Sequence, residues 1–333
     1  MDALSEVLKV VELDGAIFFN AEFSSPWCFR SPPAVDVAPV LAPGSSHVIV
    51  YHLLVEGEAY IRLEDGDPVV LRPGDIVTCP HGDAHWLGHG QNAVLIDGAQ
   101  ALPALLAQGL DLVRTGGGGA PSRFICGFLA CEPQLCETFM GDLPPIVKVN
   151  IRDDPSGQWL ENSLRFSVGE AVAARAGAEA MLAKLSEVVF VETLRRYVRD
   201  LPAEQTGWLA GARDPIVGKT LTLMHRRPEH AWTIAELARD VGVSRSVLAD
   251  RFGQLLGEPP ITYLTRWRLR LGAHALATTN QSVAEIAGTV GYESEAAFNR
   301  AFKREFDLPP ARYRQAERTR RQAPAVEASD SRQ

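Results

Sequence analysis

An internal repeat in the last third of the 333-residue chain constrains its fold more than any other feature. The segment Thr233 to Gly242, TIAELARDVG, recurs as Ser282 to Gly291, SVAEIAGTVG. Each copy opens with Thr or Ser followed three residues later by Glu, which is the pattern of a capping box at a helix N-terminus. Apolar residues then recur at helical spacing, and each copy ends at a glycine able to take the positive φ of a tight turn. The repeat therefore predicts two copies of one helical unit.

A second helix is expected after each glycine. One is predicted to start at Ser244 and the other at Ser294, and each ends before a Pro-Pro pair, Pro259-Pro260 or Pro309-Pro310. Two short helices joined by a tight turn that contains glycine form a helix-turn-helix. Between the two units, Ile261 to Ala277 is predicted to form one longer helix that fixes their separation.

A helix-turn-helix contacts DNA by placing its second helix in the major groove, so the outward faces of these helices are candidate DNA-binding surfaces. Arg and Asn side chains can pair with guanine and adenine, whereas Lys and the other Arg side chains suit phosphates. The outward residues of the first helix are Arg245, Ser246, Ala249, Asp250 and Arg251, and those of the second are Ser294, Glu295, Ala296, Asn299, Arg300, Lys303 and Arg304.

The charge distribution agrees with this interpretation. Residues 1–212 hold 14 Lys and Arg against 27 Asp and Glu, whereas residues 213–321 hold 18 against 12. A basic end on an acidic body is expected when that end meets a polyanion. The alternative is a helical bundle whose basic face is only solvated. The duplicated caps, turn glycines and Pro-Pro stops favour DNA binding.

The second unit resembles a known family. The segment Gly291 to Phe306, GYESEAAFNRAFKREF, with the following Pro309-Pro310 and Tyr313-Arg314, resembles the signature of AraC/XylS-type transcriptional regulators. The first unit, Trp232 to Tyr263, is similar to the other helix-turn-helix of that family. The resemblance implies a seven-helix DNA-binding domain over residues 205–315, which activates transcription through contacts with RNA polymerase.

The N-terminal part is predicted to be rich in β-strands. Residues 16–100 contain short apolar runs separated by turn residues, which suggests a sandwich or a barrel. The stretch Gly74 to His85, GDIVTCPHGDAH, resembles the second cupin motif, and His52 with Glu56-Gly57 is a poor version of the first. We therefore expect a multidomain chain, with an all-β cupin-like barrel and flanking helices over residues 1–160 and an all-α double helix-turn-helix module after it.

Three histidines are candidate effector or metal residues, because imidazole is a good ligand for zinc or iron. They are His52, His81 and His85. A divalent metal requires at least three convergent ligands, and the cupin-like motif lacks the His-x-His pair of metal-dependent cupin enzymes. The alternative, in which these histidines cap turns or pair across strands, stays open.

The cysteines offer a second kind of sensor. Cys126 lies in a predicted strand, where burial is the default, whereas Cys131 and Cys136 fall on a loop or helix start and are expected to be accessible. An accessible thiolate can react with oxidants or electrophiles, so all three are redox candidates, with inert packing as the alternative. Nearby, Gly116 to Gly119 is predicted to be a flexible loop after a helix over Ala101 to Val113.

The middle of the chain is predicted to connect the two domains. Residues 161–204 carry apolar residues at helical spacing, such as Leu182, Leu185 and Val189, which would mediate homodimerisation or pack against the β domain. Pro202 to Pro215 is the expected linker, and residues 316–333 are the expected disordered tail.

These features together predict a DNA-binding transcription factor that senses a small molecule or a redox or electrophile signal. Its expected partners are double-stranded DNA, RNA polymerase, an effector and a second copy of the chain. The sequence has no apolar run long enough for a membrane span and no signal peptide, so a cytoplasmic protein is expected. No enzyme activity is expected, because the first cupin motif is incomplete. The alternatives are a metal-dependent cupin enzyme fused to a DNA-binding module and an architectural DNA binder.

Overall fold

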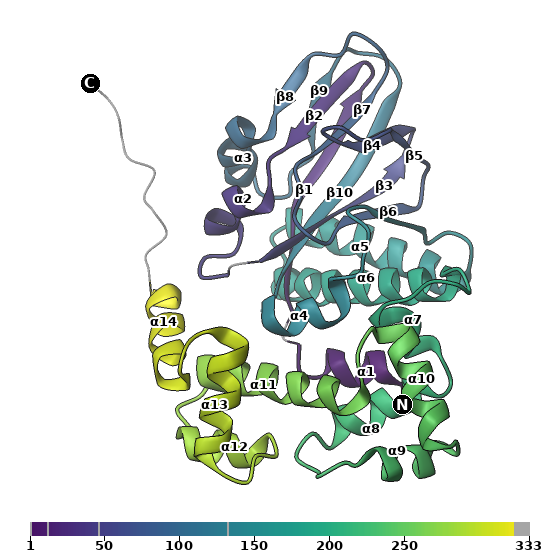
Figure 1. Cartoon of the computed structure of the whole chain (residues 1–333). Coiled ribbons are helices and arrows are strands. Elements are labelled where there is room, and N and C mark those ends of the chain that lie inside the picture. Colours follow the sequence, from purple (N-terminus) through teal and green to yellow (C-terminus); the bar gives the residue numbers. More distant parts are fainter. Residues whose placement is uncertain (1, 12, 46, 132, 323–333) are drawn as a thin grey trace. The chain divides into compact units, whose positions relative to one another are not determined.

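A computed structural model describes residues 2–11, 13–45, 47–131 and 133–322. Its described residues divide into two compact units, one formed by residues 13–131 and 143–197 and the other by residues 2–11, 133–142 and 198–322. Figure 1 shows the elements of both units. In the part of the chain that the structure describes, no helix is both long and apolar enough to cross a membrane.

The first of these units is a strand-rich barrel, as predicted. Its strands form two sheets, in the orders β11-β6-β3-β10-β1-β9 and β5-β4-β7-β2-β8. The bounds of the strands are β1 Leu13–Ser24, β2 Trp27–Ser31, β3 Val48–Glu56, β4 Ala59–Leu63, β5 Val69–Leu71, β6 Asp75–Cys79, β7 His85–His89, β8 Leu95–Asp97, β9 Val113–Gly116, β10 Pro121–Cys131 and β11 Val147–Asn150.

The core of the barrel lies between the inner faces of the two sheets. Aromatic side chains dominate it: the rings of Phe23 and Trp27 stack with centroids 4.3 Å apart, and Phe124 meets Trp27 edge-on at 5.8 Å. All three are buried. Burying one side chain of this kind contributes about 1.5–3 kcal/mol, so the apolar run along β10, which is buried on both faces, favours this arrangement.

The glycine run after β9 differs from its prediction. Gly117 N donates to Ser24 O at 2.7 Å, and Gly119 N donates to Ser25 O at 2.8 Å, so the run is a hydrogen-bonded turn and not a free loop. The preceding helix, α3, spans Gly98–Ala107, and Val113 belongs to strand β9. The prediction of a helix up to Val113 was therefore wrong, because strand pairing with β1 outweighs the local pattern.

Besides α2 Ala34–Leu41 and α3, this unit contains the helices α5 Pro155–Val172 and α6 Ala178–Asp200. The last three residues of α6 belong to the other unit. Leu182, Leu185 and Val189 of α6 are buried, and Ser186 bonds the hydroxyl of Tyr51 on β3 at 2.8 Å. The apolar series of α6 thus packs on the strands of its own chain.

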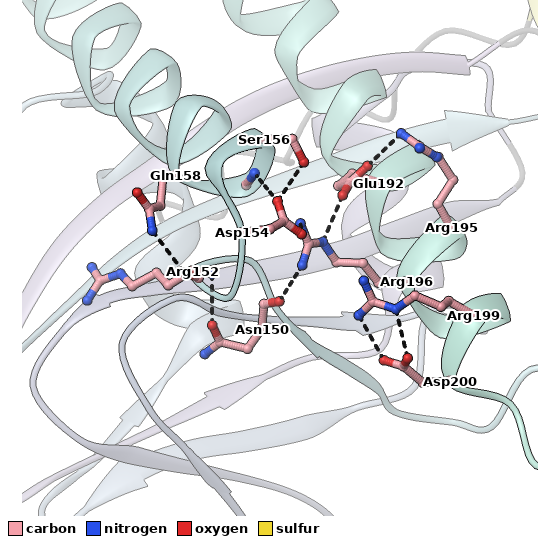
Figure 2. Close-up of polar contacts among 11 residues, drawn as sticks. Asn150, Arg152, Asp154, Ser156, Gln158, Glu192, Arg195, Arg196, Arg199 and Asp200 are labelled. Atoms are coloured by element: carbon pink, nitrogen blue, oxygen red, sulfur yellow. Dashed lines mark hydrogen bonds and ion pairs between the residues drawn. The ribbon is translucent and has the colours of Figure 1, made fainter.

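An ion-pair network fixes the start of α5. Figure 2 shows Arg196, a buried side chain, which donates to Asp154 at 2.7 Å and to Glu192 at 2.8 Å, and also to the backbone oxygen of Asn150 at 3.0 Å. Asp154 accepts from Gly157 N at 3.0 Å and so caps α5. The hydroxyl of Ser156 also donates to Asp154, at 2.6 Å. This bond and the one from Gly157 N are the main causes that lower the pKa of the Asp154 carboxyl.

The other unit is helical. Its helices are α1 Ala3–Leu8, α4 Pro133–Met140, α7 Trp208–Arg213, α8 Val217–Arg226, α9 Ile234–Val241, α10 Arg245–Leu256, α11 Pro260–Thr278, α12 Val283–Thr289, α13 Glu295–Phe306 and α14 Pro310–Gln322. Helices α8 to α14 provide the seven helices that the resemblance implies. Because α14 continues to Gln322, the expectation of a disordered tail was wrong for residues 316–322. Residues 323–333 lie outside the described residues.

Two segments that the sequence assigned to the sensor domain belong to this helical unit. Helix α4 meets α11 where the guanidinium of Arg270 bonds Thr138 and pairs with Glu137 at 3.1 Å. Asp142 accepts from Trp208 N at 2.9 Å. Helix α1 packs on α8. The unit is therefore assembled from three separate stretches of the chain.

A buried aromatic cluster joins α7, α8 and α11. The ring of His225 stacks between those of Trp208 and Trp267, and its Nε2 lies 2.8 Å from the hydroxyl of Tyr263. Trp208 Nε1 donates to the same hydroxyl at 2.7 Å. Since Trp208 is buried, the segment Pro202 to Pro215 is not the expected linker but contains part of this core.

The buried imidazole of His225 predicts a pH dependence of stability. Burial lowers its pKa from 6.5 to about 3, so below about pH 6.5 the unfolded chain binds a proton that the folded chain does not. We expect the free energy of unfolding to fall by about 2 kcal/mol between pH 7 and pH 5 from this group. Urea denaturation at both pH values measures it. In the His225→Gln variant that part of the pH dependence should be absent. An unchanged pH dependence in the variant would contradict this assignment.

Candidate DNA interface and sensor site

The first helix-turn-helix consists of α9, a three-residue turn and α10. Thr233 accepts from Glu236 N at 3.2 Å while Glu236 accepts from Thr233 N at 3.0 Å, which completes the predicted capping box. Gly242 takes φ 81° in the turn, and Ser244 caps α10 by accepting from Val247 N at 3.2 Å. A left-handed turn residue is strained for any side chain except glycine, so this glycine sets the angle between the helices.

The outward face of α10 holds most of the predicted residues. Arg245, Ser246 and Asp250 are exposed, and Ala249 is half-buried. Arg251 is exposed but has a partner within the protein, because its guanidinium bonds Asp214 at 2.8 and 2.9 Å. Asp214 in turn caps α8. Arg251 thus braces α10 against the start of α8.

Sequence reasoning missed an apolar residue on this face. The side chain of Val247 is 46% exposed, next to Ser246. An exposed valine on a recognition helix can contact the methyl group of thymine. Its exposure follows from its place one residue before the buried Leu248, so helical spacing alone would have identified it.

The second helix-turn-helix, α12 to α13, repeats the first with different outward chemistry. Ser282 and Glu285 form the capping box, and Ser294 caps α13 by accepting from Ala297 N at 3.2 Å. Gly291 takes φ 85°, and a Cβ there would lie 2.8 Å from the backbone of Glu229. Both the conformation and the close approach therefore require glycine at this turn.

The outward face of α13 is the more basic of the two. Glu295, Arg300, Lys303 and Arg304 are exposed. Asn299 is half-buried, and its Nδ2 donates to Glu295 O at 3.0 Å. This bond uses one N–H of the Asn299 amide, which also carries a second N–H and an accepting Oδ1. Phe298 and Phe302 fill the opposite face, with their rings 5.3 Å apart.

In the barrel, the structure brings together two predicted site histidines and one predicted cysteine. His52 lies on β3 and His85 at the start of β7, in different sheets, and their Nε2 atoms are 2.8 Å apart. On its other side, His52 Nδ1 lies 2.9 Å from the sulfur of Cys126 on β10. All three side chains are buried. Strand register explains the cysteine contact, because Cys126 is directly opposite His52 in the β3–β10 pair.

Cys126, His52 and His85 form a hydrogen-bonded chain, and the direction of each of its hydrogen bonds can be deduced. His85 Nδ1 lies 2.9 Å from Asp83 O, which can only accept, so Nδ1 of His85 carries the proton. In a neutral imidazole the other nitrogen then accepts, so His52 Nε2 donates to it. His52 Nδ1 must therefore accept, and the thiol of Cys126 donates. Burial lowers the pKa of His52 and of His85, which keeps both rings neutral.

Cys126, the last member of this hydrogen-bonded series, is a thiol and not a thiolate. Burial raises the pKa of Cys126, and it raises that of the neighbouring Cys79 to about 12. Cys79 lies 3.4 Å from His85 Nδ1. A buried thiol in apolar surroundings is less nucleophilic than an exposed one, because the reactive species is the thiolate.

His52 and Cys126 border a small apolar pocket between the two sheets. Its enclosed volume is about 40 Å³. The lining residues come from β1, β2, β3, β7 and β10 and from the covering helices α2 (Ala34–Leu41) and α3: Phe19, Phe23, Phe29, Ser31, Pro32, Val37, Leu41, Val50, His52, Leu87, Gly98, Leu102, Leu105 and Cys126.

His81 is not part of the hydrogen-bonded chain of Cys126, His52 and His85. Its Nε2 bonds the backbone oxygen of Leu143 at 2.8 Å. Among the described residues, no group of three or more His, Cys, Asp and Glu side chains is placed to hold a metal ion. The facing Nε2 atoms of His52 and His85 would supply two metal ligands, and a third is not in place, so these side chains do not fit a metal centre.

The other predicted redox residues are not accessible. Cys131 is the last residue of β10 and Cys136 lies within α4, and both are buried. The expectation that they are exposed was wrong, because each takes the inward position of its element. All five cysteines are described, and none forms a disulfide.

Comparisons with known proteins agree with this architecture. Residues 2–199 match the Cupin family, and residues 237–316 match the Helix-turn-helix domain family. A putative AraC-like transcription regulator of Streptomyces lividans is 31% identical over 94% of this chain and 98% of its own length. The chain belongs to the AraC-like family of transcription regulators.

Other relatives extend over the whole of this AraC-like regulator. The HTH-type transcriptional regulator AlkR of Acinetobacter baylyi is 28% identical over 95% of this chain and 99% of its own. The RCS-specific HTH-type transcriptional activator RclR of Escherichia coli is 28% identical over 97% and 100%. Among solved structures, the DNA-binding domain of AdpA in complex with a target DNA is 32% identical, with a TM-score of 0.31, over 33% of this chain and 99% of that one. The predicted order, cupin first and DNA-binding domain last, is confirmed.

The burial of the cysteines predicts their reactivity. Cys28 is half-buried and the other four are buried, so we expect at most one thiol to react within minutes when the folded protein meets an aromatic disulfide reagent such as Ellman's. In urea all five should react. The Cys28→Ser variant is the control, and it should show no rapid phase. A rapid phase that persists in this variant would mean that a barrel or α4 thiol is accessible.

Proposed function

We propose that this AraC-like regulator is a sequence-specific activator of transcription and that its cupin barrel receives the inducing signal. The observation that carries the proposal is the exposed face of α13, where Arg300, Lys303 and Arg304 project from a capped helix that follows a tight turn. Such side chains on a second helix can contact base edges and phosphates. The matching face of α10, with Arg245 and Ser246, supports a second contact in a neighbouring groove.

Activation is the sign of regulation that we propose. RclR, which aligns with 97% of this chain, is named a transcriptional activator. By analogy, the protein would bind double-stranded DNA beside a promoter in the cytoplasm and contact RNA polymerase there.

The signal is proposed to act at the pocket beside His52 and Cys126. Of the predicted effector and redox residues, these two line the pocket together. A small molecule that binds there, or an electrophile that reaches Cys126, would favour one arrangement of the regulator over another, as in a population shift. We propose no enzymatic reaction, because a neutral hydrogen-bonded chain and two facing nitrogens do not form a reaction centre.

A homodimer is also proposed. Trp159 and Phe166 on α5 are 61% and 63% exposed, and Met181 and Val188 on α6 are also exposed. Each pair is spaced seven residues apart and so lies on one face of its helix. Large exposed apolar side chains that share a helix face mark interaction sites, so these two faces favour contact with a second copy.

The proposed base contact of Arg300 can be tested by site selection. Binding sites are first selected from random double-stranded DNA with the full-length protein. If Arg300 pairs with guanine, Arg300→Ala should cost about 1–3 kcal/mol at one base position and relax the preference there. Arg114→Ala, which removes an exposed charge from β9, is the control and should leave binding unchanged. A uniform loss across all sequences would identify Arg300 as a phosphate contact.

The alternative function, a metal-dependent cupin enzyme fused to a DNA-binding module, predicts a bound metal. We expect the full-length protein, purified without chelators, to carry less than about 0.1 metal per chain by mass spectrometry, since two imidazole donors do not complete a site. The His85→Gln variant is the comparison. One metal per chain that disappears in this variant would support the enzyme instead.

A further inference from the structure

The barrel pocket is apolar on almost every wall. Phe19, Phe23 and Phe29 line it from β1 and β2, and Leu102 and Leu105 line it from α3. Its polar side chains are Ser31, His52 and Cys126, and none of the described residues that line it is charged. A ligand in this pocket therefore meets no cation and no carboxylate.

The polar side chains offer few free hydrogen-bonding atoms. Both nitrogens of His52 are engaged, one by the thiol proton of Cys126 and the other by His85. What is left is the weakly accepting sulfur of Cys126 and the hydroxyl of Ser31, which makes a long bond of 3.5 Å to Pro32 O. Because Asp83 O fixes the direction of the whole chain, His52 cannot offer a new donor without breaking it.

We propose that this pocket binds an uncharged, largely apolar small molecule with at most one hydrogen-bonding group, and that it rejects carboxylates and sugars. A carboxylate would lose its hydration there and gain no cation and at most one donor, the hydroxyl of Ser31, and most hydroxyls of a sugar would be left unpaired. The proposal deepens the proposed function and rests on it, since it names the chemical class of the effector.

The helices that cover the pocket provide the way in. The enclosed space of about 40 Å³ is smaller than an aromatic ring requires, so the ligand must displace part of a wall. Helix α3 is suited to this, because its only side chains in the pocket, beside Gly98, are two half-buried leucines, and most of its other side chains are exposed. Pro103 inside α3 and Pro39 inside α2 each remove a backbone donor, which weakens both helices. Figure 1 shows the two helices at the side of β2 and β8.

The test compares ligands of one shape and different charge. Full-length protein is titrated by calorimetry with para-ethylphenol, para-ethylbenzoate and a pentose at about pH 7.5. We expect saturable binding of the phenol, and binding of the benzoate and the pentose weaker by at least about tenfold. Equal or tighter binding of the benzoate or the pentose would overturn the proposed ligand class. Failure of the phenol to bind would overturn it as well.

Two pairs of variants locate the binding in the pocket. Leu105→Trp should fill the space and abolish binding of the phenol, whereas Leu106→Trp, one residue along α3 and outside the lining, should not. Leu102→Lys should bring a cation to the pocket and raise the affinity for the benzoate at least about tenfold, whereas Leu106→Lys should not. Binding that survives in Leu105→Trp would place the ligand elsewhere and overturn the proposal.

The same proteins separate this inference from the proposed function. The affinity for the selected DNA site is measured by fluorescence anisotropy with and without the phenol. If the phenol binds in the pocket and DNA affinity and transcription are unchanged, the ligand class is correct and the sensor role is wrong. If an oxidant or the benzoate alters transcription through this barrel and the phenol does not bind, the sensor role stands and the ligand class is wrong.

Discussion

The pairing of β10 with β1 on one side and β3 on the other is the constraint on which the barrel depends. The register of these two pairings places Cys126 opposite Phe19 on one side and opposite His52 on the other. A slip of one residue would exchange the two faces of β10, so Phe124 and Cys126 would leave the aromatic core. The same register that buries the aromatic core therefore also builds the pocket and its hydrogen-bonded chain.

The chain from Cys126 through His52 to His85 also determines the character of the pocket. Each donor in it has an acceptor, so the two imidazoles can be buried as neutral groups without an ion. A charged ring would instead require a counter-ion that the pocket does not offer. His52 and His85, which lie in the cupin-like motifs, thus connect the two sheets through one hydrogen bond. Because the direction of these hydrogen bonds leaves His52 without a free donor or acceptor, an apolar ligand suits the pocket better than an ionic one.

The sequence predicted the DNA-binding domain better than the sensor site for a physical reason. Capping boxes, turn glycines and Pro-Pro stops act within a few residues, so α9 to α13 can be located from local patterns. His52 and Cys126 are 74 residues apart, and only the strand register brings them together. Helix α1, helix α4 and Trp208 were assigned to the sensor domain or a linker because their burial depends on helices far along the chain. The burial of Cys131 and Cys136 could not be predicted for the same reason.

The two helix-turn-helix units share a scaffold but differ in the chemistry that they offer to DNA. In α13, three exposed cations, Arg300, Lys303 and Arg304, are available for phosphates and bases. In α10, Asp250 adds a negative charge and Arg251 is held by Asp214, so Arg245 is the exposed cation nearest the start of the helix. The dependence of affinity on salt should then come mainly from α13. Helix α10, with Ser246 and Val247 beside Arg245, has the chemistry to select bases through a few short contacts, so the two helices offer different contacts to DNA.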